Sequence, residues 1–172
     1  GLPELRRAIS DYYQRTYAVA VDPDHIIITP GTSPAMLLLF AALLEPGDEV
    51  IVCINGVFGG RIKENVERAG GIPVVVEDPW GRAVDPNKVE ATLKANPDAR
   101  IVSFVHAETS TGTRSDASTL VDIAHRHDCL AIVDAVTSLA GCELEVDAWE
   151  IDAIYAGTQK CLSCIPGLSP VS

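Results

Sequence analysis

Short apolar runs alternate with amphipathic stretches along the whole chain, and this pattern limits the possible folds more than any other feature of the sequence. The runs are apolar throughout rather than at every second residue, as in strands that are buried on both faces of a parallel sheet. The sequence therefore predicts an α/β fold, with a mainly parallel sheet sandwiched by helices. We expect strands at residues 26–29, 49–53, 73–76, 100–105, 130–133 and 153–156. We expect helices at residues 4–18, 34–44, 60–69, 85–95 and 118–127, the second of them capped by Ser33.

Composition limits the class of partner. The 172 residues suffice for one domain with a buried core. Asp and Glu number 24 against 13 Lys and Arg, and the resulting net charge of -11 disfavours binding to a nucleic-acid backbone. The longest apolar stretch, residues 35–44, is too short to span a bilayer. We therefore expect a protein that handles small molecules, with no nucleic-acid or membrane partner.

The five cysteines form no disulfide framework, because their number is odd. Cys161 and Cys164 have the C-x-x-C spacing, which alone is half of a zinc site at best. We predict free thiols, no metal and a cytoplasmic location. Both ends of the chain read like the middle of a protein, so we also expect it to be part of a longer one.

Ligands of such sheets bind at the carboxyl ends of the strands, so the residues that follow each predicted strand are the candidates for function. Gly31, Thr32 and Ser33 open a helix after the first strand, where free backbone N–H groups and the helix dipole can bind a phosphate. An ordinary capped helix would have the same sequence. Phe58 follows the second strand between glycines, and its ring is either a stacking surface for a planar ligand or part of the core.

Three later strand ends carry further candidates. Ser110 belongs to the polar segment 106–112, which is either a plain loop or a ligand-facing loop with several hydroxyl donors. Asp134 ends a buried strand, where a carboxylate needs a cationic or hydrogen-bonded partner unless it caps a helix or a surface turn. Lys160 lies among small and apolar residues, where an amine can form a Schiff base, although many lysines extend to solvent instead. Together, a phosphate-binding helix start, an aromatic ring, a carboxylate and a lysine are the groups that a protein needs to bind pyridoxal phosphate.

Three segments, 106–112, 134–141 and 157–162, give the chain a specific resemblance by their order and spacing. The chain resembles the fold-type I pyridoxal-phosphate enzymes, and from about residue 51 onwards it resembles the class V aminotransferases of the alanine–glyoxylate and serine–glyoxylate (serine–pyruvate) group. Phe58 stands where many members have Trp. Residues 1–6 and 29–35 look more like class I/II aminotransferases, which share the fold.

The resemblance implies a role for each candidate residue. Lys160 would bind the cofactor as a Schiff base and then carry a proton between the substrate and the cofactor. Asp134 would pair with the pyridinium nitrogen, while Phe58 and Val136 would pack on the two faces of the ring and Ser110 would reach the ring hydroxyl. The residues that would bind the phosphate are Gly31, Thr32, Ser33 and Gln159, with a contribution from Thr158.

The activity implied by the resemblance is transfer of an amino group from a small amino acid, alanine or serine, to a 2-oxo acid such as glyoxylate or pyruvate. The full-length protein would be a homodimer. Residues 1–172 would be part of the large cofactor-binding domain, and the small C-terminal domain, which supplies an arginine for the substrate carboxylate, would be absent. We therefore expect the chain alone to bind cofactor weakly and to turn over poorly.

Three alternatives remain open at this point. Another class V activity, cysteine desulfurase or 2-aminoethylphosphonate aminotransferase, would fit the same fold, although desulfurases typically have His where this chain has Phe58 and Gln159. A catalytically silent domain would not need both Asp134 and Lys160. A dinucleotide-binding domain would need a G-x-G-x-x-G motif after its first strand, which this chain lacks.

Overall fold

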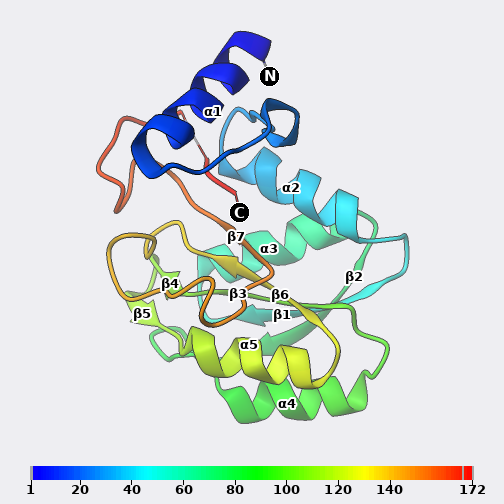
Figure 1. Cartoon of the computed structure of the whole chain (residues 1–172). Coiled ribbons are helices and arrows are strands. Elements are labelled where there is room, and N and C mark those ends of the chain that lie inside the picture. Colours follow the sequence, from blue (N-terminus) through cyan, green and yellow to red (C-terminus); the bar gives the residue numbers. More distant parts are fainter. Residues whose placement is uncertain (1, 168, 172) are drawn as a thin grey trace.

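The computed structural model describes residues 2–167 and 169–171. Among these residues, five parallel strands form one sheet in the order β2-β1-β3-β6-β7, which confirms the predicted α/β fold (Figure 1). The strands of this sheet are β1 (Glu49–Ile54), β2 (Ile72–Glu77), β3 (Ile101–Val105), β6 (Leu130–Asp134) and β7 (Ala153–Tyr155). Two short strands, β4 (Ala107–Glu108) and β5 (Thr113–Arg114), form a separate antiparallel ribbon.

Helices cover both faces of the sheet, because successive side chains of a strand point to opposite faces and the central strands are apolar on both. The helices are α1 (Pro3–Tyr17), α2 (Thr32–Leu43), α3 (Val57–Arg68), α4 (Pro86–Ala95) and α5 (Ala117–Arg126). The helices α2 and α3 lie on one side of the sheet, and α4 and α5 lie on the other (Figure 1). Val50 and Val52 of β1 pack on the side of α2 and α3, whereas Ile51 and Cys53 pack on the side of α4 and α5.

Residues 26–29 do not form a strand, so this prediction from the sequence is wrong. They follow a short 3-10 helix, η1 (Pro23–His25), as irregular chain, and Ile27 is 75% exposed. A strand needs the backbone of a neighbouring strand to satisfy its N–H and C=O groups. At the β7 edge of the sheet, the backbone of Tyr155 forms an isolated antiparallel bridge with Val171 instead.

Two helices begin earlier than the sequence predicts. Gly31 is the N-cap of α2, so Ser33 lies in the first turn and does not cap the helix. The helix α3 begins at Val57 rather than at residue 60, because the Glu108 carboxylate accepts hydrogen bonds from the first-turn N–H groups. Both helices therefore begin with residues that belong to the predicted ligand-binding loops.

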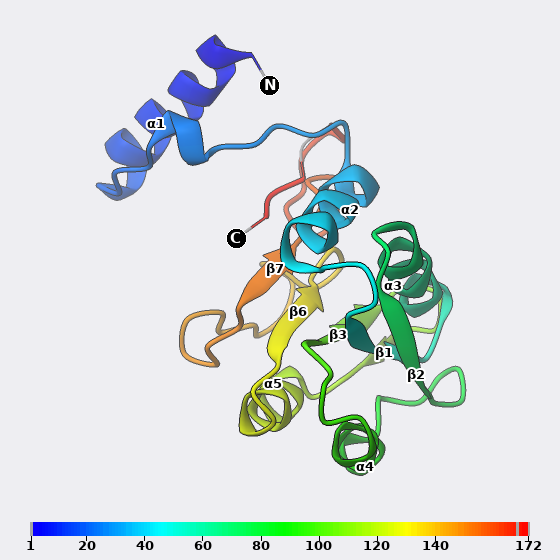
Figure 2. The ribbon, with the colours of Figure 1, turned by 90° about the vertical axis from the view of Figure 1, so that its right-hand side faces the viewer.

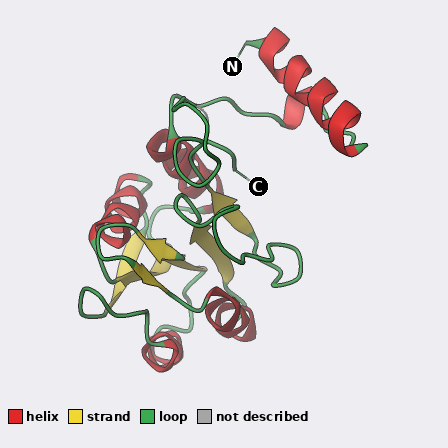
Figure 3. Cartoon of the chain, turned by 90° about the vertical axis from the view of Figure 1, so that its left-hand side faces the viewer, coloured by secondary structure: helices red, strands yellow, loops and turns green. Residues whose placement is uncertain are grey.

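The helix α1 projects away from the rest of the molecule, as Figures 2 and 3 show from two sides, and none of its residues is buried. Tyr12, Tyr13 and Tyr17 pack against one another on this helix, with ring centroids 5.6 to 6.2 Å apart. No helix in the described part of the chain is long and apolar enough to cross a membrane. The five cysteines are free thiols, as predicted.

Candidate active site

A pocket of about 360 Å³ lies where β3, β6 and β7 end and where α2 and α3 begin. This is the edge of the sheet at which ligands of parallel α/β folds bind. The predicted site residues that line the pocket are Thr32, Ser33, Phe58, Asp134, Val136, Gln159 and Lys160. Residues far apart in the sequence thus meet in one cavity.

The Asp134 carboxylate faces this pocket from the end of β6 and is 5% exposed. Its Oδ1 accepts the N–H of Val136 at 2.9 Å, and among the described residues it takes part in no ion pair. Burial raises the pKa of Asp134 to about 6 and repulsion from Glu108 adds to this, while Val136 and the Tyr155 hydroxyl act in the opposite direction. A cation brought into the pocket would stabilise this buried carboxylate.

Phe58 is the second residue of α3, and Glu108 fixes the position of its backbone. The Glu108 side chain is 1% exposed, and its Oε2 accepts the N–H of Phe58 at 3.0 Å and that of Gly59 at 3.3 Å. The positive end of the helix dipole favours a carboxylate at this point. A Cβ atom at position 56 would overlap the Glu108 side chain, so the arrangement requires Gly56. The guanidinium of Arg61 lies 5.0 Å from the centroid of the Phe58 ring.

Ser110 does not line the pocket. Its hydroxyl donates to Oε1 of Glu108 at 2.7 Å and accepts the N–H of Val57 at 3.0 Å, so it belongs to the cap of α3. The preceding residue, Thr109, lines the pocket, and its hydroxyl donates to that of Thr137 at 3.1 Å. The contact of Ser110 with a cofactor hydroxyl stays a prediction.

Thr32 and Ser33 are the first two residues of α2, and both line the pocket. First-turn N–H groups have no acceptor within their own helix, and the helix dipole adds positive potential there. Gly31 at the N-cap has a φ of 119°, a value that favours glycine, but it is not part of the pocket lining. The Thr32 and Ser169 hydroxyl oxygens are 2.9 Å apart. The start of α2 is therefore suited to bind an anion such as a phosphate.

Lys160 follows β7 in an exposed turn and is one of the residues that line the same pocket. The N–H of Ser163 donates to the Lys160 carbonyl at 3.0 Å and closes this turn. Gln159 is also exposed and lines the pocket. Thr158 is buried behind it, outside the lining, and its hydroxyl donates to the Ile165 carbonyl at 2.8 Å. A lysine, a buried aspartate and a helix N-terminus therefore line one pocket.

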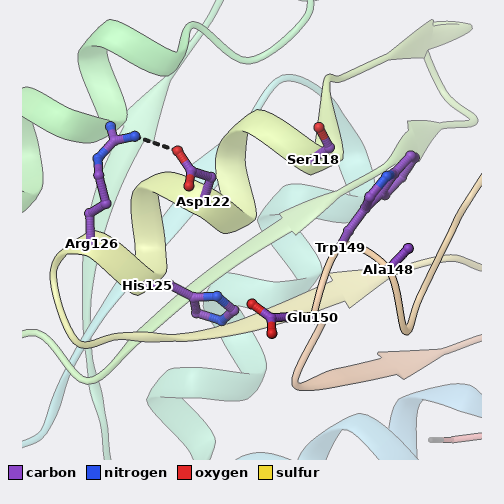
Figure 4. A pocket seen from close by; sticks show the side chains of 7 residues that line it. All are labelled: Ser118, Asp122, His125, Arg126, Ala148, Trp149 and Glu150. Carbon is purple, nitrogen blue, oxygen red and sulfur yellow. Dashed lines mark hydrogen bonds and ion pairs between the residues drawn. The ribbon is translucent and has the colours of Figure 1, made fainter.

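A second cavity, of about 460 Å³, lies between α5 and the loop that precedes β7 (Figure 4). Three of its side chains, those of Asp122, His125 and Arg126, bind neighbouring groups. Arg126 pairs with Asp122, as the dashed line in Figure 4 marks, and His125 Nε2 lies 2.8 Å from an Asp152 oxygen outside the lining. This cavity contains none of the residues predicted for the site.

A model of the aminotransferase class V family matches residues 14–169, which include every residue of the pocket. The chain belongs to the class V aminotransferases. Members of this family depend on pyridoxal phosphate.

Named relatives place this class V aminotransferase beside enzymes that use glyoxylate. It is 40% identical over 143 residues to the (S)-ureidoglycine–glyoxylate transaminase of Bacillus subtilis, an alignment that covers 83% of the chain and 34% of the relative. It is 31% identical to the alanine–glyoxylate aminotransferase of Rattus norvegicus over 99% of the chain and 40% of the relative. A solved alanine–glyoxylate aminotransferase from Nostoc sp. superposes with a TM-score of 0.82 at 32% identity, over 99% of the chain and 45% of that structure.

The chain thus spans between a third and a half of the length of these relatives. The alignment with the rat enzyme includes the N-terminal stretch as well, whose motifs look more like class I/II aminotransferases. The first fifty residues therefore align with the same branch of the family as the rest of the chain.

Four polar or charged residues of the chain line or support the site without having been predicted from the sequence, and three apolar residues of the lining were not predicted either: Met36, Val105 and Ala107. Arg61 lines the pocket. It could have been predicted from the sequence, because residues three apart on a helix lie on the same face and Arg61 follows Phe58 by three residues. Tyr155 and Thr109 line the pocket too: Thr109 belongs to the segment 106–112 that carries the resemblance, and Tyr155 lies two residues before the segment 157–162. Glu108 supports the site from below α3, and only the tertiary structure shows its hydrogen bonds to that helix.

Proposed function

We propose that the pocket holds pyridoxal phosphate and that the chain is the cofactor-binding part of an aminotransferase that passes amino groups to glyoxylate. One observation carries the proposal: Asp134, a buried acid with no ion-pair partner among the described residues, lines the same pocket as Lys160. A buried carboxylate can form an ion pair with the protonated ring nitrogen of pyridoxal phosphate. A lysine amine can form a Schiff base with the aldehyde of the same cofactor.

The other residues of the pocket fit the remaining parts of the cofactor. The N-terminus of α2, with the hydroxyls of Thr32 and Ser33, offers donors for the phosphate, and the Gln159 amide lies on the same cavity. Phe58 and Val136 provide two apolar surfaces for the ring. The contribution of Gly31 and Thr158, which lie outside the lining, would be to shape the backbone that holds the phosphate donors.

Pyridoxal phosphate supplies an electron sink that stabilises negative charge at the α-carbon of an amino acid. The protein would keep the ring nitrogen protonated and would move the proton of the substrate α-carbon. Asp134, in its ionised form, would keep the ring nitrogen protonated, which the sink requires. The amine of Lys160 would hold the cofactor covalently and, once released by an incoming amino group, would take the proton from the substrate α-carbon.

The substrate class comes from the relatives. Their names include the amino acceptor glyoxylate, paired with ureidoglycine, alanine or aspartate as donor. We propose glyoxylate or pyruvate as acceptor and alanine or serine as donor for the protein of which this chain is part. Arg61, which lines the pocket, offers a cation for a carboxylate, but the rest of the substrate site is not assigned to described residues.

We also propose that the protein acts as a homodimer. The support is the helix α1, none of whose residues is buried. Its N-cap Leu2 and three of its tyrosines, Tyr12, Tyr13 and Tyr17, are exposed and could pack against a second chain. Light scattering of the purified protein should give the mass of two chains, and a monomeric mass at micromolar concentration would contradict the proposal. The cytoplasmic location stays a prediction.

Covalent trapping tests the cofactor assignment even if binding is weak. The chain would be incubated with pyridoxal phosphate and reduced with borohydride, and the modified lysine would be located by peptide mass spectrometry. We expect the modification at Lys160, together with a visible absorbance band that Lys160→Ala loses. The control is Lys94→Ala, which removes an exposed lysine on α4 and should retain both signals.

Modification spread over exposed lysines, without preference for Lys160, would show that the pocket does not direct the reaction. Where the band is present, adding L-alanine or L-serine and then glyoxylate tests the substrates. Loss of the band on adding the amino acid, and its return with glyoxylate, supports the aminotransferase assignment. A band that neither amino acid changes would reject these donors while leaving the cofactor site intact.

A further inference from the structure

Tyr155 is the last residue of β7, and its side chain is 1% exposed although it lines the pocket. Its hydroxyl is buried and has no well-formed hydrogen bond to a described residue, but it lies close enough to the Asp134 carboxylate for the two groups to interact. A buried hydroxyl without a partner destabilises the fold, so its presence calls for an explanation such as a ligand or a neighbouring charge.

The strand register places Tyr155 directly beside Asp134. The two residues are paired Cα partners in the parallel ladder of β6 and β7, so their side chains point to the same face of the sheet. The N–H of Ala135 donates to the Tyr155 carbonyl at 2.9 Å and fixes this alignment. Both side chains line the same cavity. The phenol therefore has a carboxylate as its neighbour in a place that water hardly reaches.

We propose that Tyr155 is a positioning residue, whose hydroxyl donates to the Asp134 carboxylate, holds it ionised and keeps it directed at the pocket. That the ionised Asp134 then serves a cofactor ring nitrogen rests on the proposed function. The effect on Asp134 itself does not depend on any cofactor.

The electrostatics of the pocket agree with this geometry. Burial and then the charge of Asp134 hold the pKa of Tyr155 well above its usual range, so the phenol keeps its proton and can donate it to a hydrogen bond. Donation to the charged form of a carboxylate lowers its pKa, which opposes the burial that raises the pKa of Asp134 to about 6. The other charged groups around Asp134 are Glu108 on β4, Arg61 on α3 and Lys160 after β7.

The first test follows the Asp134 carboxyl without cofactor. Carbon-13 NMR of the aspartate-labelled chain, with the Asp134 signal identified by its loss in Asp134→Asn, would give the titration midpoint in the original chain and in Tyr155→Phe. A hydrogen bond to a charged group is worth about 1.5 kcal/mol, so the midpoint should rise by about one pH unit in Tyr155→Phe. The control is Tyr12→Phe on the projecting helix α1, which should leave the midpoint unchanged. An equal midpoint in Tyr155→Phe and the original chain would overturn the proposal.

The second test measures cofactor affinity at two pH values. Midpoints of about 6 and 7 give ionised fractions of Asp134 that differ about threefold near pH 6.5 and hardly at all near pH 8.5. Tyr155→Phe should therefore weaken cofactor binding about threefold at the lower pH only, and not in an Asp134→Asn background. A loss of equal size at both pH values, or in the Asp134→Asn background, would show a merely structural role and overturn the proposal. If the original chain binds no cofactor through Lys160, the proposed function fails, whereas the NMR titration still decides the role of Tyr155.

Discussion

The carboxylate of Glu108 accepts the backbone N–H of Phe58 at 3.0 Å, and thereby joins the β4–β5 ribbon to the first turn of α3. The same carboxylate accepts bonds from Gly59 and from both the N–H and the hydroxyl of Ser110. Four donors thus meet at one buried acid. The orientation of the pocket-facing Phe58 ring depends on a residue that itself lies outside the pocket lining.

Replacing Glu108 by Ala should lower the free energy of unfolding by on the order of 3 kcal/mol, because it leaves several buried donors without an acceptor and removes the cap of α3. Urea denaturation followed by circular dichroism measures this change. The control is Glu64→Ala, an exposed acid of the same helix, whose effect should stay within about 0.5 kcal/mol. Equal effects of the two substitutions would show that the cap contributes nothing.

Two adjacent glycines of α3 should respond in opposite directions to alanine. A Cβ atom at Gly59 would lie 2.7 Å from the Cys53 carbonyl oxygen and 2.9 Å from the Ile54 Cα, both of which are backbone atoms of β1 that cannot yield. Gly59→Ala should therefore destabilise the chain by about 1–3 kcal/mol through overpacking. Nothing lies within 4 Å of a Cβ at Gly60, so Gly60→Ala should stabilise the chain by about 0.5–1 kcal/mol. Thermal melts of the two variants check both signs, and a stabilising Gly59→Ala would disprove the close packing of α3 on β1.

Asp134 should make the stability of the cofactor-free chain depend on pH. Its pKa is about 6 in the folded chain and near 4 when unfolded, so the folded chain binds the proton more tightly. The stability that this group contributes is full below about pH 4 and is lost as the pH rises through about 6. Asp134→Asn should therefore be more stable than the original chain by roughly 2–3 kcal/mol near pH 8, and by much less near pH 4. Denaturation curves at both pH values measure the difference, and a difference that does not change with pH would argue against a raised pKa.

The Phe58 ring should contribute to cofactor affinity through stacking. Phe58→Leu keeps an apolar side chain but removes the aromatic face, which is worth about 0.5–1.5 kcal/mol, or roughly two- to tenfold in affinity. Titration of pyridoxal phosphate followed by absorbance measures the change. The matched control is Trp80→Leu, which removes an exposed aromatic residue that is not part of the pocket lining and should leave affinity unaltered. Unchanged affinity in Phe58→Leu would mean that another surface holds the ring.

The order of helices and strands was readable from the sequence because the hydrophobic pattern that produces them is local. Asp134 and Lys160 could be assigned to one edge of the sheet for a related reason: successive parallel strands end at the same edge, wherever they lie in the sequence. The residues at those ends thus meet by topology alone. In the structure, Asp134, Lys160, Phe58 and the start of α2 line one pocket.

Contacts that depend on pairing between distant segments could only come from the tertiary structure. Residues 26–29 are as apolar as a buried strand but find no strand to pair with, so their pattern misleads. Ser110 turns toward Glu108 rather than into the pocket because the carboxylate at the start of α3 takes its hydroxyl. The proximity of Tyr155 to Asp134 depends on the register of β6 against β7. A shift by one residue would turn the Tyr155 side chain to the opposite face, and only the packing of the whole sheet fixes that register.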